Sequence, residues 1–353
     1  MNILKRVCRI LAILTAAAVL LCAVLVSVLI SLNAAPKTAA HGTQSIEITG
    51  EGSALFEIKD GESSISVGRR LAEAGVIHNE LLWNILSRLD RKFIKTGVYQ
   101  IELPVNQIAL HKILQEGRQK LLRVTVAEGL TLKKTAAIVE NASICKAEDF
   151  IAACADPAVL NEFKIHAANA EGFLYPDTYL FTAHYPANLV VKKMIGTFFQ
   201  RLTEIGVDYE RLNPVELYNK VILASIVERE YRDKEEAPVI AGVFQNRLNK
   251  RMRLESCATV EYIITEIEGK PHPARLFNQD TQKNHPYNTY VRAGLPPGPI
   301  ASPGAVALGA AFFPASSEYL FFRVIDPDAG RHYFSKTFDD HIKAGELYLK
   351  RFR

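Results

Sequence analysis

The sequence predicts an α+β protein in which one membrane-spanning helix precedes a small folded region and a larger one. Three observations support this prediction. An uncharged apolar run lies near the N-terminus. After it, segments with strand-like alternation are interspersed with segments whose apolar residues have helical spacing. The 353 residues are enough for two or three compact domains.

The composition is that of an ordinary globular protein and gives no support to nucleic-acid binding. Apolar residues make up 48% of the chain and charged residues 23%. The net charge is only +4, and no run rich in Lys or Arg occurs beyond the N-terminus. The slightly basic balance is weak support for an anionic polymer or a membrane surface as partner.

The apolar run covers residues 10–32 without a charged residue. As a helix it would be roughly 35 Å long, enough to cross the hydrocarbon core of a bilayer. A cleaved signal peptide, with Thr38-Ala39-Ala40 as its best site, is the main alternative, although its apolar region is normally only about 7–15 residues long. A lipoprotein site at Cys22 is disfavoured by the bulky Leu21. We therefore expect an uncleaved anchor.

The charges around this anchor predict its orientation. Lys5, Arg6 and Arg9 precede the apolar run, and the first charged residue after it is Lys37. The positive-inside rule keeps such an N-terminus in the cytoplasm. We expect residues 1–34 to form a cytoplasmic stub and a single-pass transmembrane helix, with the remainder of the chain outside the cytoplasm.

A linker and a small α+β unit are expected next. Residues 35–45 are small and polar, which is typical of a linker. Residues 46–121 contain strand-like and helix-like segments in turn. The strands are expected at 46–48, 55–58 and 97–101, and the helices at 66–75, 80–89 and 108–114. Ser66 is the expected N-cap of the first of these helices.

The larger unit is expected to span residues 122–353. It begins with a strand at 122–126 and continues through Glu128-Gly129-Leu130-Thr131 into a helical region. Residues 171–179 interrupt these helices with aromatic, Gly and Pro residues. This segment, which contains Tyr175, is either a binding loop or a buried corner between helices.

The C-terminal part of this unit combines a Pro/Gly-rich loop at 294–300 with a hairpin. The strands of the hairpin are expected at 319–324 and 332–335. A final helix follows, with Thr337 as its expected N-cap and Asp340 in the capping-box position.

The five cysteines give no metal-ligand pattern. Cys8 and Cys22 belong to the anchor region. Cys145, Cys154 and Cys257 have neither a CxxC pairing nor a His partner at ligand spacing. Cys145 and Cys154 could form a disulfide in an oxidising compartment, or both could be buried thiols.

One helix carries a carboxylate where its pattern requires a core residue. Asn213 at the N-cap, Pro214 at the first helical position and Glu216 at the third give this helix a strong start signal. The apolar face that follows contains Leu217, Val221 and Ala224. Four residues further on, the same face reaches Glu228. Glu230 falls off this face, and we expect it to be solvated.

A buried carboxylate is costly unless it is paired or protonated. Desolvation would raise the pKa of Glu228 toward the range that a general acid requires. The alternative from the residues alone is a Glu at a fraying helix end, which reaches water or pairs with Arg229 or Arg232. No nucleophile elbow, phosphate loop or HExxH motif occurs. The sequence therefore favours carboxylate acid–base catalysis on a neutral polar substrate.

Five segments, in their order and spacing, resemble the endolytic murein transglycosylases, the YceG-like family. They are 171–179 (EGFLYPDTY), 223–230 (LASIVERE), 241–248 (AGVFQNRL), 287–290 (YNTY) and 294–300 (GLPPGPI). Together they extend over most of residues 122–345. The N-terminal anchor fits the family's layout, and residues 46–121 look like its LysM-like subdomain, which makes 122–353 its catalytic domain.

The resemblance implies a lytic transglycosylase, which cleaves peptidoglycan within its glycan strands. Such an enzyme breaks the β-1,4 bond between N-acetylmuramic acid and N-acetylglucosamine and leaves a 1,6-anhydro end. The family's catalytic Glu corresponds to Glu228. One carboxylate suffices as general acid and base because the substrate's own C6 hydroxyl attacks the anomeric carbon, whereas ordinary glycosidases use two carboxylates. No metal or cofactor is implied.

The implied partners are peptidoglycan glycan strands, the membrane and cell-wall synthases. The implied location is the cytoplasmic (inner) membrane, with the catalytic domain extracytoplasmic or periplasmic. A linker of roughly ten residues would keep that domain within a few tens of Å of the bilayer, so we expect action on nascent strands.

One stretch departs from the family pattern. Many relatives read L-Q-S-D-P-T-V where this chain has Leu254-Glu255-Ser256-Cys257-Ala258-Thr259-Val260. Glu255 is thus a second acidic candidate, which we rank as a substrate-side or structural residue. The substrate-binding candidates are Glu255, Ser256, Asn288, Tyr290 and Tyr175, and a packing role is the alternative for each.

Two other functions stay open at this point. The first is a non-catalytic peptidoglycan-binding or scaffold protein of the cell-wall synthesis machinery, which only the altered stretch at 255–258 supports. The second is a two-carboxylate hydrolase that uses Glu228 and Glu255 and would leave reducing ends in place of anhydro ends.

Overall fold

The N-terminal helix α1 (Asn2–Asn33) is long and apolar enough to cross a bilayer. Its segment Ile13–Asn33 contains 21 residues with a mean hydropathy of 2.9. This segment is about 30 Å long, which matches the hydrocarbon core of a membrane. The computed structural model describes residues 2–36, 39–48, 52–59, 61–89, 93–117 and 121–349. Lys37 and Thr38, used above for orientation and as a cleavage site, lie outside the described residues.

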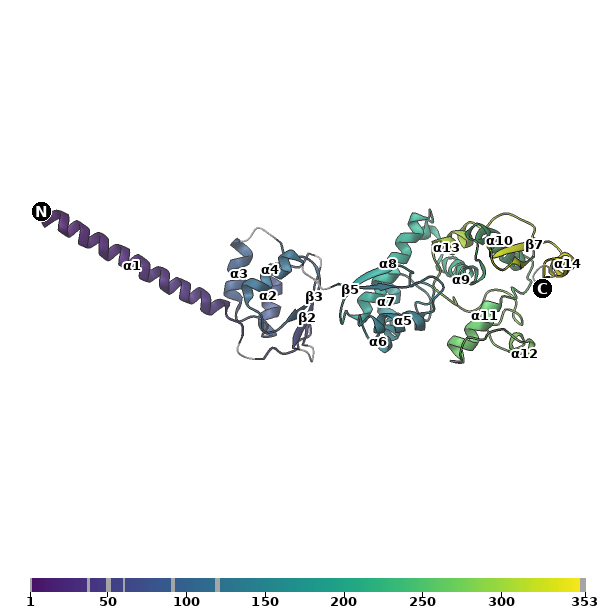
Figure 1. Cartoon of the computed structure of the whole chain (residues 1–353), viewed down its shortest axis with the longest axis horizontal. Helices are drawn as coiled ribbons and strands as arrows, with labels where there is room; N and C mark the ends of the chain where they lie inside the picture. Colours follow the sequence, from purple (N-terminus) through teal and green to yellow (C-terminus); the bar gives the residue numbers. More distant parts are fainter. Residues whose placement is uncertain are drawn as a thin grey trace. The chain divides into compact units, whose positions relative to one another are not determined.

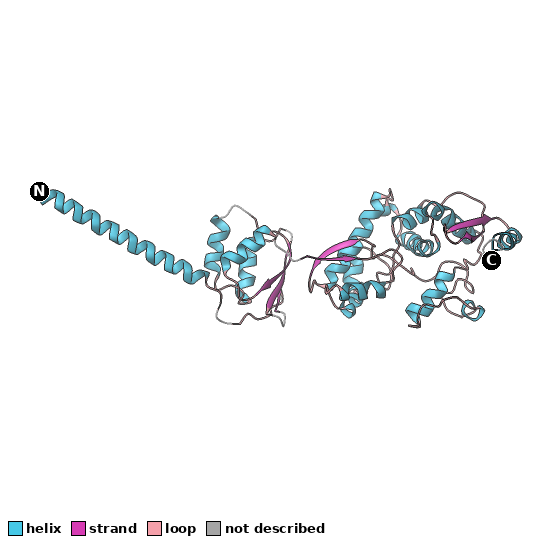
Figure 2. Cartoon of the chain, viewed as in Figure 1, coloured by secondary structure: helices cyan, strands magenta, loops and turns pink. Residues whose placement is uncertain are grey.

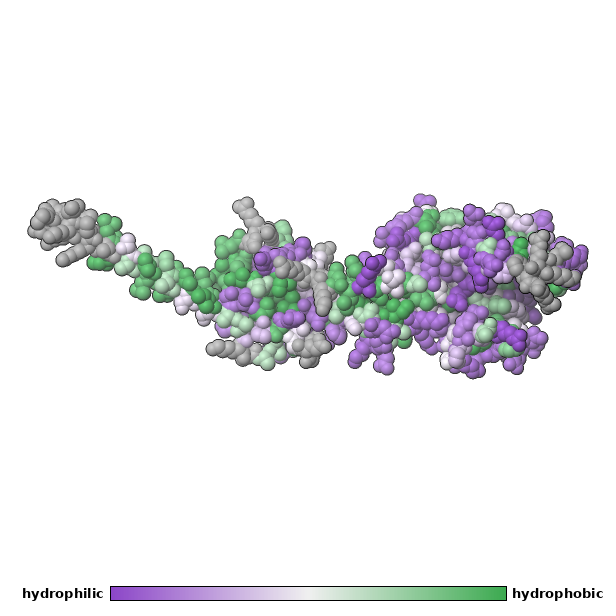
Figure 3. Space-filling view, in the orientation of Figure 1, coloured by the Kyte–Doolittle hydropathy of each residue, from purple (hydrophilic) through white to green (hydrophobic). Residues whose placement is uncertain are grey.

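Two compact units make up the chain. The first contains Met1–Leu121 and Thr182–His184, and the second contains Leu122–Phe181 and Tyr185–Arg353. Both combine helices with small antiparallel or two-stranded sheets (Figure 1, Figure 2), so the predicted α+β class is confirmed. Figure 3 shows hydrophobic surface along α1, as its composition requires.

In the first unit, three helices pack on one face of a three-stranded antiparallel sheet. The strands pair in the order β1 (Ile46–Ile48), β2 (Ser53–Ile58) and β3 (Gly97–Glu102). The helices are α2 (Ser64–Glu73), α3 (Glu80–Leu89) and α4 (Gln107–Glu116). Alternate strand residues and the inner helix faces share one apolar core. The likeness of this unit to a LysM subdomain stays a prediction.

The core of the first unit depends on a close approach of α2 and α3. Trp83 is fully buried, and its Nε1 donates a hydrogen bond to the Ser64 carbonyl oxygen at 2.7 Å. A Cβ on Gly68 would lie 2.1 Å from Cδ1 of Trp83. Only a residue without a side chain therefore lets the indole lie against α2.

The second unit has two strand pairs and a helical core. The strand pairs are β4 (Leu121–Thr125) with β5 (Thr178–Thr182), and β6 (Phe321–Asp326) with β7 (Arg331–Ser335). The helices that precede α9 in the chain are α5 (Leu132–Asn141), α6 (Ala147–Cys154), α7 (Pro157–Glu162), α8 (Ala187–Glu204) and η1 (Tyr209–Arg211). Those that follow are α9 (Pro214–Glu230), η2 (Lys234–Glu236), α10 (Ala237–Asn249), α11 (Cys257–Tyr262), η3 (Ile263–Ile267), α12 (Asn278–Thr281), α13 (Ala305–Phe312) and α14 (Phe338–Leu349). The predicted C-terminal hairpin is confirmed as β6 and β7, which pair antiparallel.

Helix α9 is the centre of the second unit and packs against α10 and α13. Every residue from Val221 to Val227 is buried, so this part of α9 is covered on all sides and has no polar face. The single apolar stripe expected from the sequence is therefore too narrow a description. Glu228 is the first residue at which α9 leaves the core.

Local signals predicted two of three helix starts. Asn213 caps α9 through a hydrogen bond from the Glu216 backbone nitrogen, and Thr337 caps α14 as expected. The prediction that Ser66 caps α2 is wrong, because the Oγ of Ser63 accepts from the Ser66 nitrogen and the helix begins earlier. Ser63 has the extended backbone of an N-cap residue.

Cys145 and Cys154 are free thiols in this structure. Burial raises the pKa of both, that of Cys145 to about 11. In this structure Cys154 is a buried thiol and Cys145 a half-buried one, which is closer to the second of the two alternatives drawn from the sequence.

Replacing Gly68 with Ala should destabilise the first unit by about 1–3 kcal/mol, because the added methyl group must displace the Trp83 ring. Trp83 is the only tryptophan of the chain, so its fluorescence during urea titration reports unfolding of this unit. Arg69→Ala, an exposed position on the same helix, should change the free energy of unfolding by less than about 0.5 kcal/mol. Equal stability of both variants would contradict the role of the contact.

Candidate active site

Glu228 lies half-buried at the C-terminal end of α9. Its Oε2 accepts a hydrogen bond from the Gly304 backbone nitrogen at 2.9 Å, and its Oε1 accepts a longer one from the Tyr231 hydroxyl at 3.5 Å. The alternative drawn from the residues alone, a Glu at a fraying helix end, is therefore not what the structure shows. The carboxyl group is held in place by partners from a separate loop and from its own helix terminus.

Hydrogen bonds join three segments, far apart in the sequence, around this carboxyl group. The turn at Gly129 pairs with the segment before α13, since the Gly129 nitrogen donates to the Ser302 oxygen and the Ser302 nitrogen to the Leu130 oxygen. The same segment is tied to α9, because the Ile300 nitrogen donates to Oγ of Ser225 at 3.0 Å. These buried hydrogen bonds fix where Gly304 stands, and hence where its N–H points.

A second carboxylate, that of Glu128, lies against Gly304 as well. A Cβ on Gly304 would lie 1.9 Å from Oε1 of Glu128. Glu128 thus lies against the α-carbon of Gly304, while Glu228 bonds the nitrogen of that residue. Glu128 itself is exposed. Sequence reasoning placed it only in a turn, because nothing in a single sequence relates two residues a hundred positions apart.

The environment of Glu228 shifts it toward the protonated form. Burial, together with the negative charge of Glu128, raises the pKa of Glu228 to about 7 against the lowering effect of the Gly304 N–H. A carboxyl group with a pKa near neutral can give up and take back a proton at physiological pH. This is the shift that desolvation of the residue was expected to cause.

The two arginines that follow Glu228 in the chain interact with groups other than its carboxylate. Arg229 donates to the Gly129 carbonyl oxygen and forms an ion pair with Glu261 at 3.3 Å. Arg232 lies at 3.5 Å from the Pro327 carbonyl oxygen. Within the part of the chain that the structure describes, neither arginine forms an ion pair with Glu228, which keeps its pKa from being lowered strongly.

Glu230 is not solvated, contrary to the expectation from the sequence. It is half-buried, and its Oε1 accepts a hydrogen bond from the Ser256 hydroxyl at 2.5 Å. Burial raises its pKa, and the Ser256 bond opposes this. Ser256 is 3% exposed, and its nitrogen donates to Oγ1 of Thr289. Ser256 therefore ties the start of α11 to the end of α9.

The other substrate-binding candidates have different surroundings. Asn288 is fully buried; its Nδ2 donates to two carbonyl oxygens, and its Oδ1 accepts from the Tyr290 nitrogen. The half-buried Tyr290 places its hydroxyl 3.1 Å from Sγ of Cys257. Glu255 is exposed, has a positive φ of 53° and pairs with Arg247 at 3.2 Å. Among the residues that the structure describes, no hydrogen bond or ion pair joins any of these side chains to Glu228.

The segment at 171–179 is a buried corner over most of its length. Tyr175 is 6% exposed, its carbonyl oxygen accepts from the Tyr179 hydroxyl, and Arg201 lies over its ring. Glu171 is buried and accepts hydrogen bonds from the Leu132 nitrogen at the start of α5. Burial raises the pKa of Glu171 to about 8. The corner therefore supports the turn that carries Glu128.

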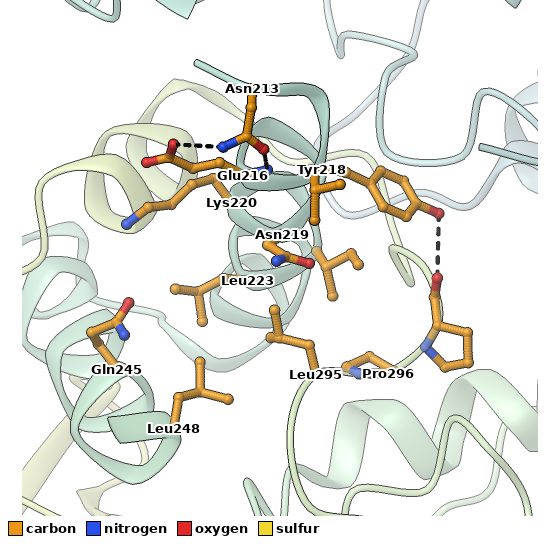
Figure 4. Close-up of a pocket in the computed structure, with 13 residues that line it drawn as sticks. Asn213, Glu216, Tyr218, Asn219, Lys220, Leu223, Gln245, Leu248, Leu295 and Pro296 are labelled. Carbon is orange, nitrogen blue, oxygen red and sulfur yellow. Dashed lines mark hydrogen bonds between the residues drawn. The ribbon is translucent and has the colours of Figure 1, made fainter. Parts of the chain in front are cut away.

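An open cavity of about 760 Å³ lies at the other end of α9. Figure 4 shows Leu223, Leu248 and Leu295 pointing into the same space, with Tyr218 bonded to the Pro297 carbonyl oxygen at its edge. The residues of α9 that line it extend from Asn213 to Leu223, which is five residues, or about 7.5 Å along the helix, from Glu228. Glu228 itself does not line the cavity.

The described residues contain no group of three or more His, Cys, Asp or Glu side chains placed to hold a metal ion. The chemistry available at Glu228 is proton transfer by one carboxyl group, beside a second carboxylate and a backbone N–H donor.

Comparison with known proteins gives consistent results. The model of the YceG-like family matches residues 56–346. The endolytic murein transglycosylase of Bacillus subtilis (strain 168) is 28% identical over 313 residues, which cover 83% of this chain and 84% of that protein. The protein of the same name from Streptococcus pneumoniae serotype 2 is 27% identical and matches 80% of this chain, which spans only 56% of that longer protein. The crystal structure of a putative YceG-like protein from Listeria monocytogenes, with 27% identity and a TM-score of 0.56, covers 83% of this chain and 99% of its own.

Two substitutions should shift the pKa of Glu228 in opposite directions. Glu128→Gln removes a neighbouring negative charge and should lower this pKa, whereas Tyr231→Phe removes a hydrogen bond to the carboxylate and should raise it. The ¹³C shift of the Glu228 carboxyl carbon, followed with pH, measures both. The exposed Glu235→Gln is the matched control and should leave it unchanged. Shifts of the same sign in both variants would contradict the geometry.

Proposed function

The chain belongs to the YceG-like family, whose model matches residues 56–346, and on this premise we propose that it is an endolytic lytic transglycosylase of peptidoglycan. The relatives named endolytic murein transglycosylase support this activity. The observation that carries the proposal is the position of Glu228, a half-buried carboxyl group with its pKa raised to about 7.

The proposed reaction needs one carboxyl group and no added water. Protonated Glu228 donates its proton to the oxygen that leaves when the bond from N-acetylmuramic acid to N-acetylglucosamine breaks. The C6 hydroxyl of the muramic acid then attacks the anomeric carbon, and the Glu228 carboxylate accepts the hydroxyl proton. One C–O bond is broken and one is formed, so the product end is a 1,6-anhydro sugar and Glu228 is regenerated in its protonated form.

Neighbouring groups have defined roles in this proposal. The Gly304 N–H and the Tyr231 hydroxyl hold the Glu228 carboxylate after it has lost its proton. Glu128 disfavours ionisation of Glu228 and is exposed, so its negative charge would also stabilise the positive charge that develops at the anomeric carbon. Ser256 and Asn288 would support the substrate side through the backbone segments that they hold, while Glu255, Tyr290 and Tyr175 stay candidates for sugar contacts.

A second candidate function is hydrolysis with two carboxylates. Glu128 lies beside Gly304, next to Glu228, and is the better candidate for the second carboxylate. Glu255 is less suitable because it forms an ion pair with Arg247. Hydrolysis would leave reducing ends, because water, activated by the second carboxylate, would take the place of the C6 hydroxyl. A scaffold without activity would leave the glycan uncut.

The anchor completes the proposal. We propose that α1 holds the enzyme in the cytoplasmic membrane as a single-pass protein, with the second unit on the extracytoplasmic side, where cell-wall synthases release new strands. The apolar length of α1 and the positive charges before it support this topology.

Glu228→Gln should lower the rate of strand cleavage by at least about 100-fold, since a general acid of this kind contributes that much or more. Mass spectrometry of digested peptidoglycan measures the anhydro-ended products. Glu235→Gln, an exposed acid near the same helix end, should retain the wild-type yield. Reducing ends from the wild-type protein would favour hydrolysis, and undiminished cleavage by Glu228→Gln would remove this residue from the mechanism.

Replacement of residues 1–35 by a cleavable export signal should release the exported protein from the membrane and leave glycan strands abnormally long in cells without the full chain. The physical reason is that the site would no longer be concentrated near the bilayer where strands emerge. Strand lengths measured by chromatography test this. Normal lengths with the truncated protein would show that the anchor has no part in substrate choice.

A further inference from the structure

The outward face of α3 is apolar, although it faces away from the core. Leu81, Ile85 and Leu89 recur every fourth residue and are 59%, 37% and 77% exposed. Residues at this spacing lie on one side of a helix. The buried Trp83 lies on the opposite side of α3, and the buried Leu82 lies beside the stripe, so α3 is apolar on two sides. We refer to Leu81, Ile85 and Leu89 as the α3 stripe.

The α3 stripe lies on the same unit as the end of the apolar span. The span ends at Asn33, and Oδ1 of Asn33 accepts a hydrogen bond from the Ile108 nitrogen at the start of α4. The Gln107 side chain donates to the Leu32 carbonyl oxygen. Helix α1 also contacts α3 itself. The first unit therefore begins where the hydrocarbon region ends.

One further exposed apolar side chain lies at this junction, and another follows α3 along the chain. Ile108 is 48% exposed, and Phe93, four residues beyond the end of α3, is 91% exposed. Figure 3 shows the hydrophobic surface of α1 continuing on to the adjoining part of the first unit, where Figure 1 places α3. Arg88 is exposed on the same side of α3 as the stripe. An arginine among apolar side chains suits the level of lipid phosphates, since its stem lies on the apolar surface and its charge reaches the headgroups.

We propose that the α3 stripe is a membrane-docking surface, which rests in the boundary between lipid headgroups and acyl chains beside the exit of α1. The occupant is the phospholipid bilayer itself. The continuity of the stripe with the span favours lipid over a protein partner, because hydrogen bonds hold the end of α1 against the unit that carries this surface. The inference rests on the proposed anchoring role of α1, and it is independent of the reaction at Glu228.

Tryptophan reporters in the full chain test the proposal. Leu89→Trp places a ring on the stripe, whereas Glu47→Trp places one on the face of β1 opposite the helices, because neighbouring strand residues point to opposite sides and Ile46 points into the core. Each variant is reconstituted in phosphatidylglycerol–phosphatidylethanolamine vesicles with bromine atoms on the acyl chains near the headgroup. The signal of Trp83 in the wild-type chain is subtracted from both.

We expect the emission added by Leu89→Trp to be quenched about two-fold by brominated lipid, and that of Glu47→Trp to be unaffected. The quenching should persist when dilution leaves one chain per vesicle. Equal or absent quenching of the two reporters, in chains that still float with the vesicles, would overturn the docking proposal alone. A blue-shifted Leu89→Trp signal that bromine does not quench, and that disappears on dilution, would assign the stripe to a second copy of the chain. Failure of the chain to float with vesicles would instead overturn the anchoring role of α1.

Discussion

The hydrogen bond from the Gly304 nitrogen to Glu228 is the interaction on which the rest of the site depends. Helix α9 is buried on every side from Val221 to Val227, so its next residue must leave the core with little access to water. An ionised carboxylate there would be costly without a donor. The loop before α13 supplies that donor, and its own position is fixed by bonds to Ser225 and to the turn at Gly129. A raised pKa and a fixed geometry thus arise from the same packing.

Short-range signals in the sequence predicted much of the fold and one residue of the site. The caps at Asn213 and Thr337 and the C-terminal hairpin are confirmed, because each depends on residues within a few positions of one another. The helical pattern also singled out Glu228. Glu128 was missed, since its relation to Gly304 arises only when the chain folds back on itself. The expected solvation of Glu230 was wrong for the same reason: its partner Ser256 comes from another helix.

The proposed substrate-binding residues differ in whether their polar groups already have hydrogen-bond partners within the protein. Asn288 uses its amide nitrogen and oxygen on the backbone of its own loop, and Ser256 uses its hydroxyl on Glu230. In the proposed site, both would therefore act on a ligand only through the shape of the segments that they hold. Tyr290 and Glu255 retain accessible surface. A sequence motif cannot separate these two kinds of residue, because both kinds are polar and lie in the same stretches of the chain.

The contact between Asn33 and the start of α4 has a consequence for the order in which the protein is made. At the N-terminal end of any α-helix, the first backbone N–H groups have no partners inside the helix. For α4 one of these, at Ile108, is satisfied by the last residue of the apolar span. Synthesis produces residue 33 long before residue 108, so the completed span is already present as a template when α4 emerges. The folding of α4 thereby depends on a segment that is among the first to be synthesised.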